Sequence, residues 1–133
     1  MEPIVVFLDT HVAVWLFAEA DRIPGQVQTF LDGSELCLSP MARLELSLLH
    51  EIGRVKDPAS AVLGALRRDL GLEVEESGWA RAAEIADHLT WTRDPFDRLI
   101  TAHAMAFGAV LCTRDARIRE HYAEAFWKSS DKG

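Results

Sequence analysis

Residues 4–9 of this chain read Ile-Val-Val-Phe-Leu-Asp, and this stretch indicates the fold more clearly than any other. A run of five apolar residues with β-branched members is typical of a parallel strand that is buried on both faces. Asp9 closes the run, and the carboxyl ends of such strands form the ligand crevice of an open α/β sheet. The stretch therefore predicts a buried first strand with a functional carboxylate at its end.

A second apolar run, at residues 109–113, is followed two positions later by Asp115. Two βα units with the usual right-handed connection end at the same edge of a parallel sheet, so Asp9 and Asp115 should share that edge. Carboxylates crowd together only where positive charge offsets their repulsion, which favours a site for a hard cation. Each acid could instead only cap the helix that follows it. Whether the two converge depends on the strand order, which the pattern leaves open.

Helices and strands alternate along the rest of the chain. Further strands are expected at residues 35–39, at residues 72–75 as an edge strand and at residues 125–128, with residues 109–113 near the centre of the sheet. Helices are expected to begin near Thr10, Pro24, Pro40, Pro58, Trp79 and Asp94, and a last one to contain Ile118. This alternation predicts an α/β fold of βαβ units around a mainly parallel sheet of four to five strands.

The length of 133 residues and the mass of 14.8 kDa predict a single domain over residues 1–128, followed by a short polar tail at residues 129–133. No apolar stretch approaches the roughly 18–20 residues of a transmembrane helix, and no basic segment precedes the first apolar run. These features predict a cytoplasmic protein without a membrane partner. Cys37 and Cys112 fall in expected strands, which indicates buried free thiols in a reducing compartment.

The chain is acidic, with 21 aspartates and glutamates against 14 lysines and arginines and a formal net charge of −7. This excess argues against a protein that holds nucleic acid through a broad basic face. It leaves open an enzyme that contacts a few phosphates through a metal ion. Because the chain contains no Gly-x-Ser-x-Gly, P-loop or Gly-x-Gly-x-x-Gly motif, the classes that carry those motifs are excluded.

The helix expected from Pro40 carries an apolar stripe in which one acid is embedded. The stripe consists of Met41, Leu44, Leu48, Leu49 and Ile52. Glu45 falls inside it at about 100° per residue, and a carboxylate that faces a core is costly unless it is paired or bound to a metal ion. Glu45 is therefore a third candidate ligand. A salt bridge to Arg43 or a solvated edge of the stripe would also explain it.

Asp94 and Asp97 flank two residues at the expected start of another helix. Asp94 suits the N-cap, Pro95 the first helical position and Asp97 the third, so capping alone explains both acids. However, the N-termini of helices in such a fold also point into the crevice at the strand ends. A capping acid there could bind a metal ion as well.

The residue types indicate which metal the acids would bind. The five histidines show no paired spacing for zinc, and the two cysteines are far apart in the chain. Oxygen ligands alone favour Mg²⁺ or Mn²⁺. Several carboxylates could hold one ion or two, and two ions about 3.5–4 Å apart would activate water and stabilise the leaving oxygen of a phosphodiester.

Histidines and arginines near the acids have two interpretations each. His103 lies on an apolar helical stripe, which favours a hydrogen-bonded core histidine over a general base. His11 follows Asp9 closely, but the helical turn of about 100° per residue is expected to direct it away from the site. Arg93, Arg98 and Arg114 bracket the acids and could steer phosphates or merely offset negative charge. The four tryptophans are scattered, which favours core and interface roles over base stacking.

Four segments, residues 6–11, 43–46, 94–100 and 111–115, resemble in this order the motifs of PIN domains, and most closely those of the VapC-type toxins of bacterial toxin–antitoxin pairs. The resemblance spans nearly the whole chain. It implies a three-layer α/β/α sandwich and an endoribonuclease that depends on Mg²⁺ or Mn²⁺ and cleaves RNA. It also implies inhibition by a cognate VapB-type antitoxin and, commonly, a homodimer.

Residue by residue, the resemblance implies a role for each acid. Asp9, Glu45, Asp97 and Asp115 fall on the catalytic, metal-binding quartet of the family, and Asp94 matches an extra acid of the Asp-Pro-Phe-Asp-Arg subgroup. Two alternatives stay open. The chain could be another PIN nuclease that acts in RNA processing or on structured DNA, or it could be a non-catalytic PIN-like binding module.

Four further residues are weaker candidates for substrate contact: Thr10, Thr113, Arg98 and Arg114. Thr113, in the Thr-Arg-Asp motif, is expected either to arrange Asp115 or to contact phosphate. One departure from the family pattern is His11, where relatives often carry a small polar residue. This departure leaves the acids intact and is expected to bear on substrate contacts.

Overall fold

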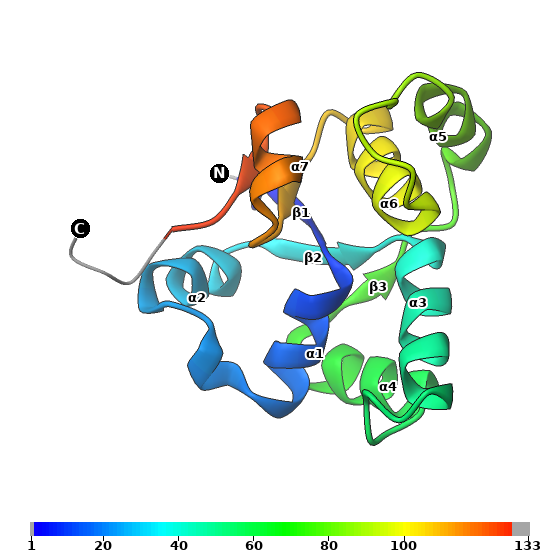
Figure 1. The fold of residues 1–133 in the computed structure, drawn as a ribbon. Coiled ribbons are helices and arrows are strands. Elements are labelled where there is room, and N and C mark those ends of the chain that lie inside the picture. The colour runs from blue at the N-terminus through cyan, green and yellow to red at the C-terminus, as the bar shows by residue number, and fades with distance from the viewer. Residues whose placement is uncertain (1, 129–133) are drawn as a thin grey trace.

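The structure is a computed structural model that describes residues 2–128 (Figure 1). Its strands are β1 (Val5–Leu8), β2 (Glu35–Leu38), β3 (Glu73–Val74), β4 (Val110–Cys112) and β5 (Ala125–Phe126). They form one five-stranded sheet in the order β3-β2-β1-β4-β5, and every neighbouring pair is parallel. The expected parallel sheet is confirmed, with residues 72–75 at an edge. The central strand is β1, with β4 beside it.

Helices cover both faces of this sheet. They are α1 (Thr10–Ala18), the short 3₁₀ helix η1 (Ala20–Arg22), α2 (Gly25–Asp32), α3 (Pro40–Glu51), α4 (Ala59–Leu70), α5 (Trp79–Ala86), α6 (Pro95–Ala106) and α7 (Ala116–His121). Figure 1 shows α1 to α4 on one side of the sheet and α5 to α7 on the other, as right-handed connections require. The three-layer α/β/α sandwich is therefore confirmed. None of the described helices is long and apolar enough to cross a membrane.

Polar residues shortly after β1, β2 and β4, and Asp94 in the segment between α5 and α6, start the helices that follow. The side chains of Asp9, Ser39, Asp94 and Asp115 each accept a hydrogen bond from a backbone N–H in the first turn of α1, α3, α6 or α7. Such caps satisfy N–H groups that have no partner inside the helix. Proline occupies the beginning of both α3 and α6. The capping interpretation of these acids is thus correct, and it brings their side chains to the edge where β1, β2 and β4 end.

The core is centred on β1. Val6, Phe7 and Leu8 are completely buried between the two helical layers, and each such burial stabilises the fold by about 1.5–3 kcal/mol. Cys37 and Cys112 are free, buried thiols, as expected. Burial raises the pKa of both thiols to about 12, so both remain protonated and unreactive at neutral pH.

His103 of α6 is a core histidine, as its position on an apolar stripe predicted. It is fully buried against the ring of Phe7, with a centroid distance of 5.1 Å. Its Nδ1 lies 3.0 Å from the Ser39 hydroxyl and its Nε2 lies 2.8 Å from the Ser77 carbonyl oxygen. Because a carbonyl oxygen only accepts, Nε2 carries the proton. His103 therefore ties the layer of α6 to the end of β2, away from solvent.

The apolar stripe of α3 is oriented differently from the expectation. Leu44, Leu48 and Ile52 are 49%, 37% and 68% exposed, while Ala42 and Leu46 form the buried face. The prediction of a core-facing stripe was wrong, because periodicity shows which side chains share a helix face but not which face meets the sheet. Glu45 consequently lies at the boundary of the buried face rather than in the middle of it.

Candidate active site

One hollow of about 410 Å³ gathers the acids that the sequence singled out. It is lined by Asp9, His11, Trp15, Glu45, Asp94, Asp97, Arg114 and Asp115. These residues come from the ends of β1 and β4 and from α1, α3 and α6. All five candidate ligands therefore share one cavity, which we call the acid pocket. Within the described residues, no lysine or arginine forms an ion pair with any of the five.

Asp9 is the most buried of these acids, at 8% exposed. Its Oδ1 accepts a hydrogen bond of 2.8 Å from the Thr10 N–H, and its Oδ2 accepts one of 2.6 Å from the Thr113 hydroxyl. Its own N–H donates to the Cys112 carbonyl at 3.0 Å, which joins the ends of β1 and β4. Burial raises the pKa of Asp9, and the hydrogen bond from Thr113 opposes that rise.

Thr113 connects two of the acids. Its buried hydroxyl donates to Asp9 and accepts a hydrogen bond of 3.0 Å from the Asp115 N–H. Both functions of the hydroxyl are thus occupied inside the protein. Its position fixes Asp9, from β1, relative to Asp115, which lies 106 residues later in the chain.

Glu45 reaches the pocket from the second turn of α3. Its Oε1 accepts a 2.6 Å hydrogen bond from the hydroxyl of Thr10, a residue that is completely buried. Burial raises the pKa of Glu45, the bond from Thr10 lowers it, and the nearby carboxylate of Asp9 raises it further. No ion pair joins Glu45 to Arg43 among the described residues, so that alternative explanation does not hold.

The pKa of Asp97 is affected by every other acid of the pocket. Burial raises its pKa to about 7, assisted by repulsion from Asp94, Asp9, Asp115 and Glu45 in decreasing order. Repulsion of this kind requires that the carboxylates lie near one another. Near neutral pH, Asp97 therefore favours a proton, or a cation that offsets its charge, far more than an isolated carboxylate does.

Asp94 and Asp115 serve as helix caps and still keep an oxygen available. Asp94 accepts from the N–H groups of Phe96 and Asp97 through Oδ1 alone. Asp115 accepts from the N–H groups of α7 in the same way, through Oδ1 at 2.8 and 3.1 Å. The second carboxylate oxygen of each has no hydrogen-bond partner in the described part of the chain. Capping and ligand binding are therefore compatible at both positions.

The donor set fits a hard divalent cation in its chemistry. Every candidate ligand is a carboxylate, and carboxylate oxygens are the preferred ligands of Mg²⁺ and Mn²⁺. The pocket is also short of positive charge, as the raised pKa of Asp97 shows. Within residues 2–128, however, no three acids, histidines or cysteines are close enough to chelate one ion as they stand. The carboxylates form an open group around the cavity rather than a closed cage.

Two residues of the pocket were missed or misjudged from the sequence. His11 is exposed and lines the pocket, so the expectation that it turns away was wrong. Trp15 lines the same wall, with its ring centroid 6.3 Å from that of His11. The spacing of four residues on α1 was the available signal, because such residues share a helix face. The guanidinium of Arg22 stacks over Trp15 at 4.8 Å and limits its movement.

Arg98 and Arg114 differ in their relation to the acids. Arg114 is exposed and lines the pocket. Arg98 is half-buried, and its Nε donates a 2.9 Å hydrogen bond to the Thr92 carbonyl just before α6. Arg93 is exposed and is absent from the lining.

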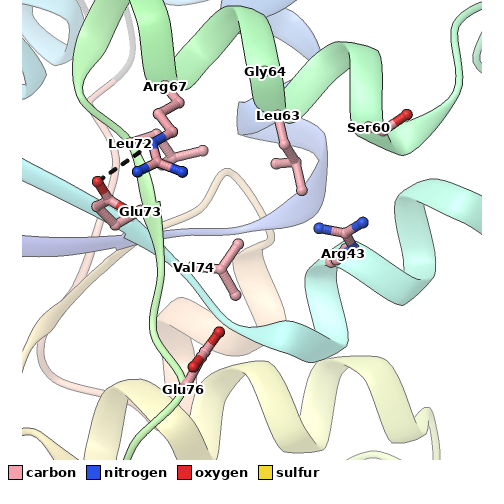
Figure 2. A pocket seen from close by; sticks show the side chains of 9 residues that line it. All are labelled: Arg43, Ser60, Leu63, Gly64, Arg67, Leu72, Glu73, Val74 and Glu76. Atoms are coloured by element: carbon pink, nitrogen blue, oxygen red, sulfur yellow. Dashed lines mark ion pairs between the residues drawn. The ribbon is translucent and has the colours of Figure 1, made fainter.

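A second hollow, of about 310 Å³, lies between α3, α4 and β3 and contains none of the predicted acids (Figure 2).

Comparison with known proteins identifies relatives of this chain. The family model of the PIN domain matches residues 6–124. Ribonuclease VapC22 of Mycobacterium tuberculosis is 35% identical over 120 residues, which cover 87% of this chain and 91% of that protein.

Two solved structures share the fold at lower sequence identity. One is VapBC2 from Rickettsia felis bound to a DNA fragment from its promoter, with a TM-score of 0.64 and 17% identity over 88% of this chain and 92% of the matched chain. The other is DNA-bound VapBC from Salmonella typhimurium, also with a TM-score of 0.64, and with 20% identity over 91% and 94% of the two chains.

Proposed function

This chain belongs to the PIN domain family, and we propose that it is a metal-dependent endoribonuclease that acts as the toxin of a toxin–antitoxin pair. The relative with 35% identity is a VapC ribonuclease, and the structural neighbours come from VapBC complexes. The observation that carries the proposal is the acid pocket. Five carboxylates surround one cavity, and no described lysine or arginine forms an ion pair with them.

In this proposal Asp9, Glu45, Asp97 and Asp115 are the catalytic acids, and Asp94 is an additional ligand. Together they would hold Mg²⁺ or Mn²⁺. When bound, such a cation activates water and stabilises the leaving oxygen of a phosphodiester. The protein needs no nucleophilic side chain for this chemistry. Its part is to hold several carboxylates at the strand ends, in an orientation set before the substrate arrives.

The buried threonines orient the acids. Thr113 holds Asp9 and the backbone of Asp115, and Thr10 holds Glu45. Both side chains are completely buried and absent from the pocket lining, so in this proposal they act through the carboxylates. In this proposal Arg114, on the pocket wall, attracts a phosphate beside the scissile bond, and Arg98, which is half-buried and absent from the pocket lining, is a weaker candidate for the same role.

Two partners follow from the proposed toxin function. A cognate VapB-type antitoxin would cover the acid pocket, and the chain would form a homodimer in the cytoplasm. The VapBC complexes among the structural neighbours support the antitoxin as a partner. The test is to examine the genes on either side of the gene for this chain and to co-express any small one with it. Purification of a complex without nuclease activity is the expected result.

RNA digestion provides the test of the activity. The unmodified chain should cleave single-stranded RNA with Mn²⁺ or Mg²⁺ and lose that activity in excess EDTA. Asp9→Asn should reduce cleavage by more than about 100-fold, because it removes an acid that would stabilise the transition state electrostatically. Asp32→Asn, at an exposed acid on α2, is the matched control and should cleave normally.

Two results would contradict the proposal. Equal cleavage in EDTA would refute the metal requirement. Absence of cleavage with either metal, by a chain that folds normally, would favour a non-catalytic binding module instead.

A further inference from the structure

Beside the acid pocket, α7 presents a second group of side chains that the proposed chemistry does not use. The helix begins directly after Asp115, so its first turn stands at the pocket rim. The Nη2 of Arg119 donates a 3.1 Å hydrogen bond to the carbonyl of Arg114, a residue that lines the pocket. His121, six residues after Asp115, lies about 9 Å along the helix axis. This surface is thus within reach of nucleotides that flank a phosphate in the pocket.

The arginines of this region are not neutralised. Arg93, Arg98, Arg114, Arg117 and Arg119 form no ion pair with any of the described residues. By contrast, Arg22, Arg67, Arg68 and Arg81 each pair with an acid within 4 Å. Other described cations, such as Arg43 and Arg54, are unpaired as well, so the distinguishing feature of this region is that Arg114, Arg117 and Arg119 gather within six positions of the chain. They create a local positive rim beside a negative cavity.

A pair of aromatic rings completes the surface. Trp91 and His121 stack with an interplanar angle of 6° and a centroid distance of 4.8 Å. Trp91 is half-buried and packs against both apolar clusters, which fixes its position. The Nδ1–H of His121 donates to the Arg117 carbonyl at 3.0 Å, which fixes the imidazole. The His121 side chain is 39% exposed although Trp91 covers one of its faces, so the opposite face is open to solvent.

We propose that Arg117, Arg119 and the Trp91–His121 ring pair, together called the α7 surface, bind the strand of single-stranded RNA that leads into the acid pocket. This inference rests on the proposed nuclease function and specifies its substrate. The arginines contact phosphates, and an unpaired base stacks on the open face of His121. Base–aromatic stacking requires an unstacked base, which single strands and loops offer and duplexes do not.

The charge of the protein supports a single strand over a duplex. Duplex binding relies on many phosphate contacts along a broad basic face, and a net charge of −7 disfavours such a face. The α7 surface offers a few cations for phosphates and one aromatic ring, that of His121, on which a base can stack. The sequence separates Trp91 from His121 by 30 positions, which is why scattered tryptophans gave no sign of a stacking site.

Fluorescence anisotropy with a short labelled RNA that lacks secondary structure tests the surface. All variants carry Asp9→Asn so that the RNA stays intact. Adding Arg117→Gln and Arg119→Gln should weaken binding about 10- to 30-fold at 0.1 M salt and lower the slope of log K against log salt by about 1.4. Adding His121→Ala should weaken binding about tenfold with little change in that slope, because stacking is not ionic.

Two further variants test whether RNA binding depends on the α7 surface or only on the net charge of the protein. Arg67→Gln with Arg68→Gln makes the same charge change on α4, at the other side of the sheet, and should leave binding within about twofold. Glu120→Gln removes the one acid of α7 and should tighten binding. Circular dichroism melting confirms that each variant is folded.

The outcomes distinguish this inference from the nuclease proposal. If the unmodified chain cleaves RNA but the α7 variants bind normally, the α7 surface is refuted and the nuclease stands. If the α7 variants lose binding but the unmodified chain never cleaves, the surface stands and the nuclease is refuted. Equal binding of duplex RNA, or a loss of antitoxin binding with RNA binding intact, would overturn the assignment to a single strand of RNA.

Discussion

Two of the hollows in the described part of the chain differ in how the charges that line them are balanced. In the hollow between α3, α4 and β3, Arg67 pairs with Glu73 at 3.6 Å, and Arg43 and Glu76 add one charge of each sign (Figure 2). In the acid pocket, five carboxylates face one cavity, and Arg114 is the one arginine of its lining. The first hollow needs no ligand to balance its charge. The second leaves an excess of negative charge.

The difference between the two hollows shows which of them can gain free energy by binding a ligand. An exposed ion pair such as Arg67–Glu73 contributes about 0–1 kcal/mol and is screened by salt. Carboxylates that are buried together repel one another, and the fold bears that cost until a proton or a cation relieves it. Burial is the main cause of the raised pKa values of Asp9, Glu45 and Asp97, and repulsion between the carboxylates raises them further. A ligand that relieves it must stabilise the folded state.

After the loss of Asp9 itself, the largest effect is expected from the residue that holds the acids together. Thr113→Val removes the donor to Asp9 and the acceptor of the Asp115 N–H. Residues that orient metal ligands typically contribute 10- to 100-fold to activity, so we expect RNA cleavage to fall by about that factor. Initial cleavage rates in Mn²⁺ measure the loss. Thr113→Ser keeps the hydroxyl and should retain most of the activity; a valine variant as active as the unmodified chain would show that Thr113 orients nothing.

A change in stability follows from removing one charge. The pKa of Asp97 is about 7 in the folded chain and near 3.8 in the unfolded chain. The unfolded state therefore loses its proton at lower pH, and the metal-free fold loses stability as the pH rises from about 4 to about 7. Asp97→Asn should remove this loss and stabilise the metal-free protein at about pH 7.5 by about 1–2 kcal/mol, after allowance for solvent screening.

Urea unfolding of both proteins at about pH 5 and about pH 7.5 measures that difference. We expect the variant to be less sensitive to pH than the unmodified chain. Equal pH dependence in the two proteins would mean that Asp97 does not bear the repulsion.

Cation binding should relieve the same repulsion in the unmodified chain. At three times the dissociation constant, Mn²⁺ would add about 0.8 kcal/mol, or about 2–4 °C in melting temperature. The shift should be larger at about pH 7.5 than at about pH 5.5, because protonated carboxylates must lose their protons to bind. Asp9→Asn should reduce the shift. A melting temperature that Mn²⁺ leaves unchanged at both pH values would contradict a metal-binding pocket.

The balanced hollow should show the smallest effect. Arg67→Gln together with Glu73→Gln removes an exposed ion pair without leaving an unpaired charge. We expect the free energy of unfolding to change by less than about 0.5 kcal/mol and RNA cleavage to stay the same. A clear loss of activity in this double variant would mean that the hollow of Figure 2 takes part in function and that charge balance is a poor guide here.

Local features of the fold were predictable from the sequence. Apolar runs located β1 and β4, because strands buried on both faces exclude polar residues. Asp9, Asp94 and Asp115 marked the helix starts, because an N-cap must accept a hydrogen bond from the backbone that follows. These rules act within a few residues of the chain, so the pattern alone carries them.

The orientation of α3 was not predictable in the same way. A helix with apolar residues on two sides can bury either, and in this chain Ala42 and Leu46 face the core while Leu44 and Ile52 face solvent. The choice is made by packing, since small Ala42 allows α3 to approach the neighbouring elements closely. The stripe argument for Glu45 was therefore incorrect, although the family resemblance pointed to the same residue. Its side chain is held by the hydroxyl of Thr10, 35 residues away.

By itself, the sequence determined that carboxylates stand at the ends of buried strands and at the starts of helices. Only the tertiary structure decided that they meet. The order β3-β2-β1-β4-β5 places β1 beside β4, and the Thr113 hydroxyl thereby reaches Asp9 across 104 positions. Strand order depends on how all the helices pack at once, because each must bury an apolar face on the same sheet. Periodicity within one segment carries no information about that arrangement.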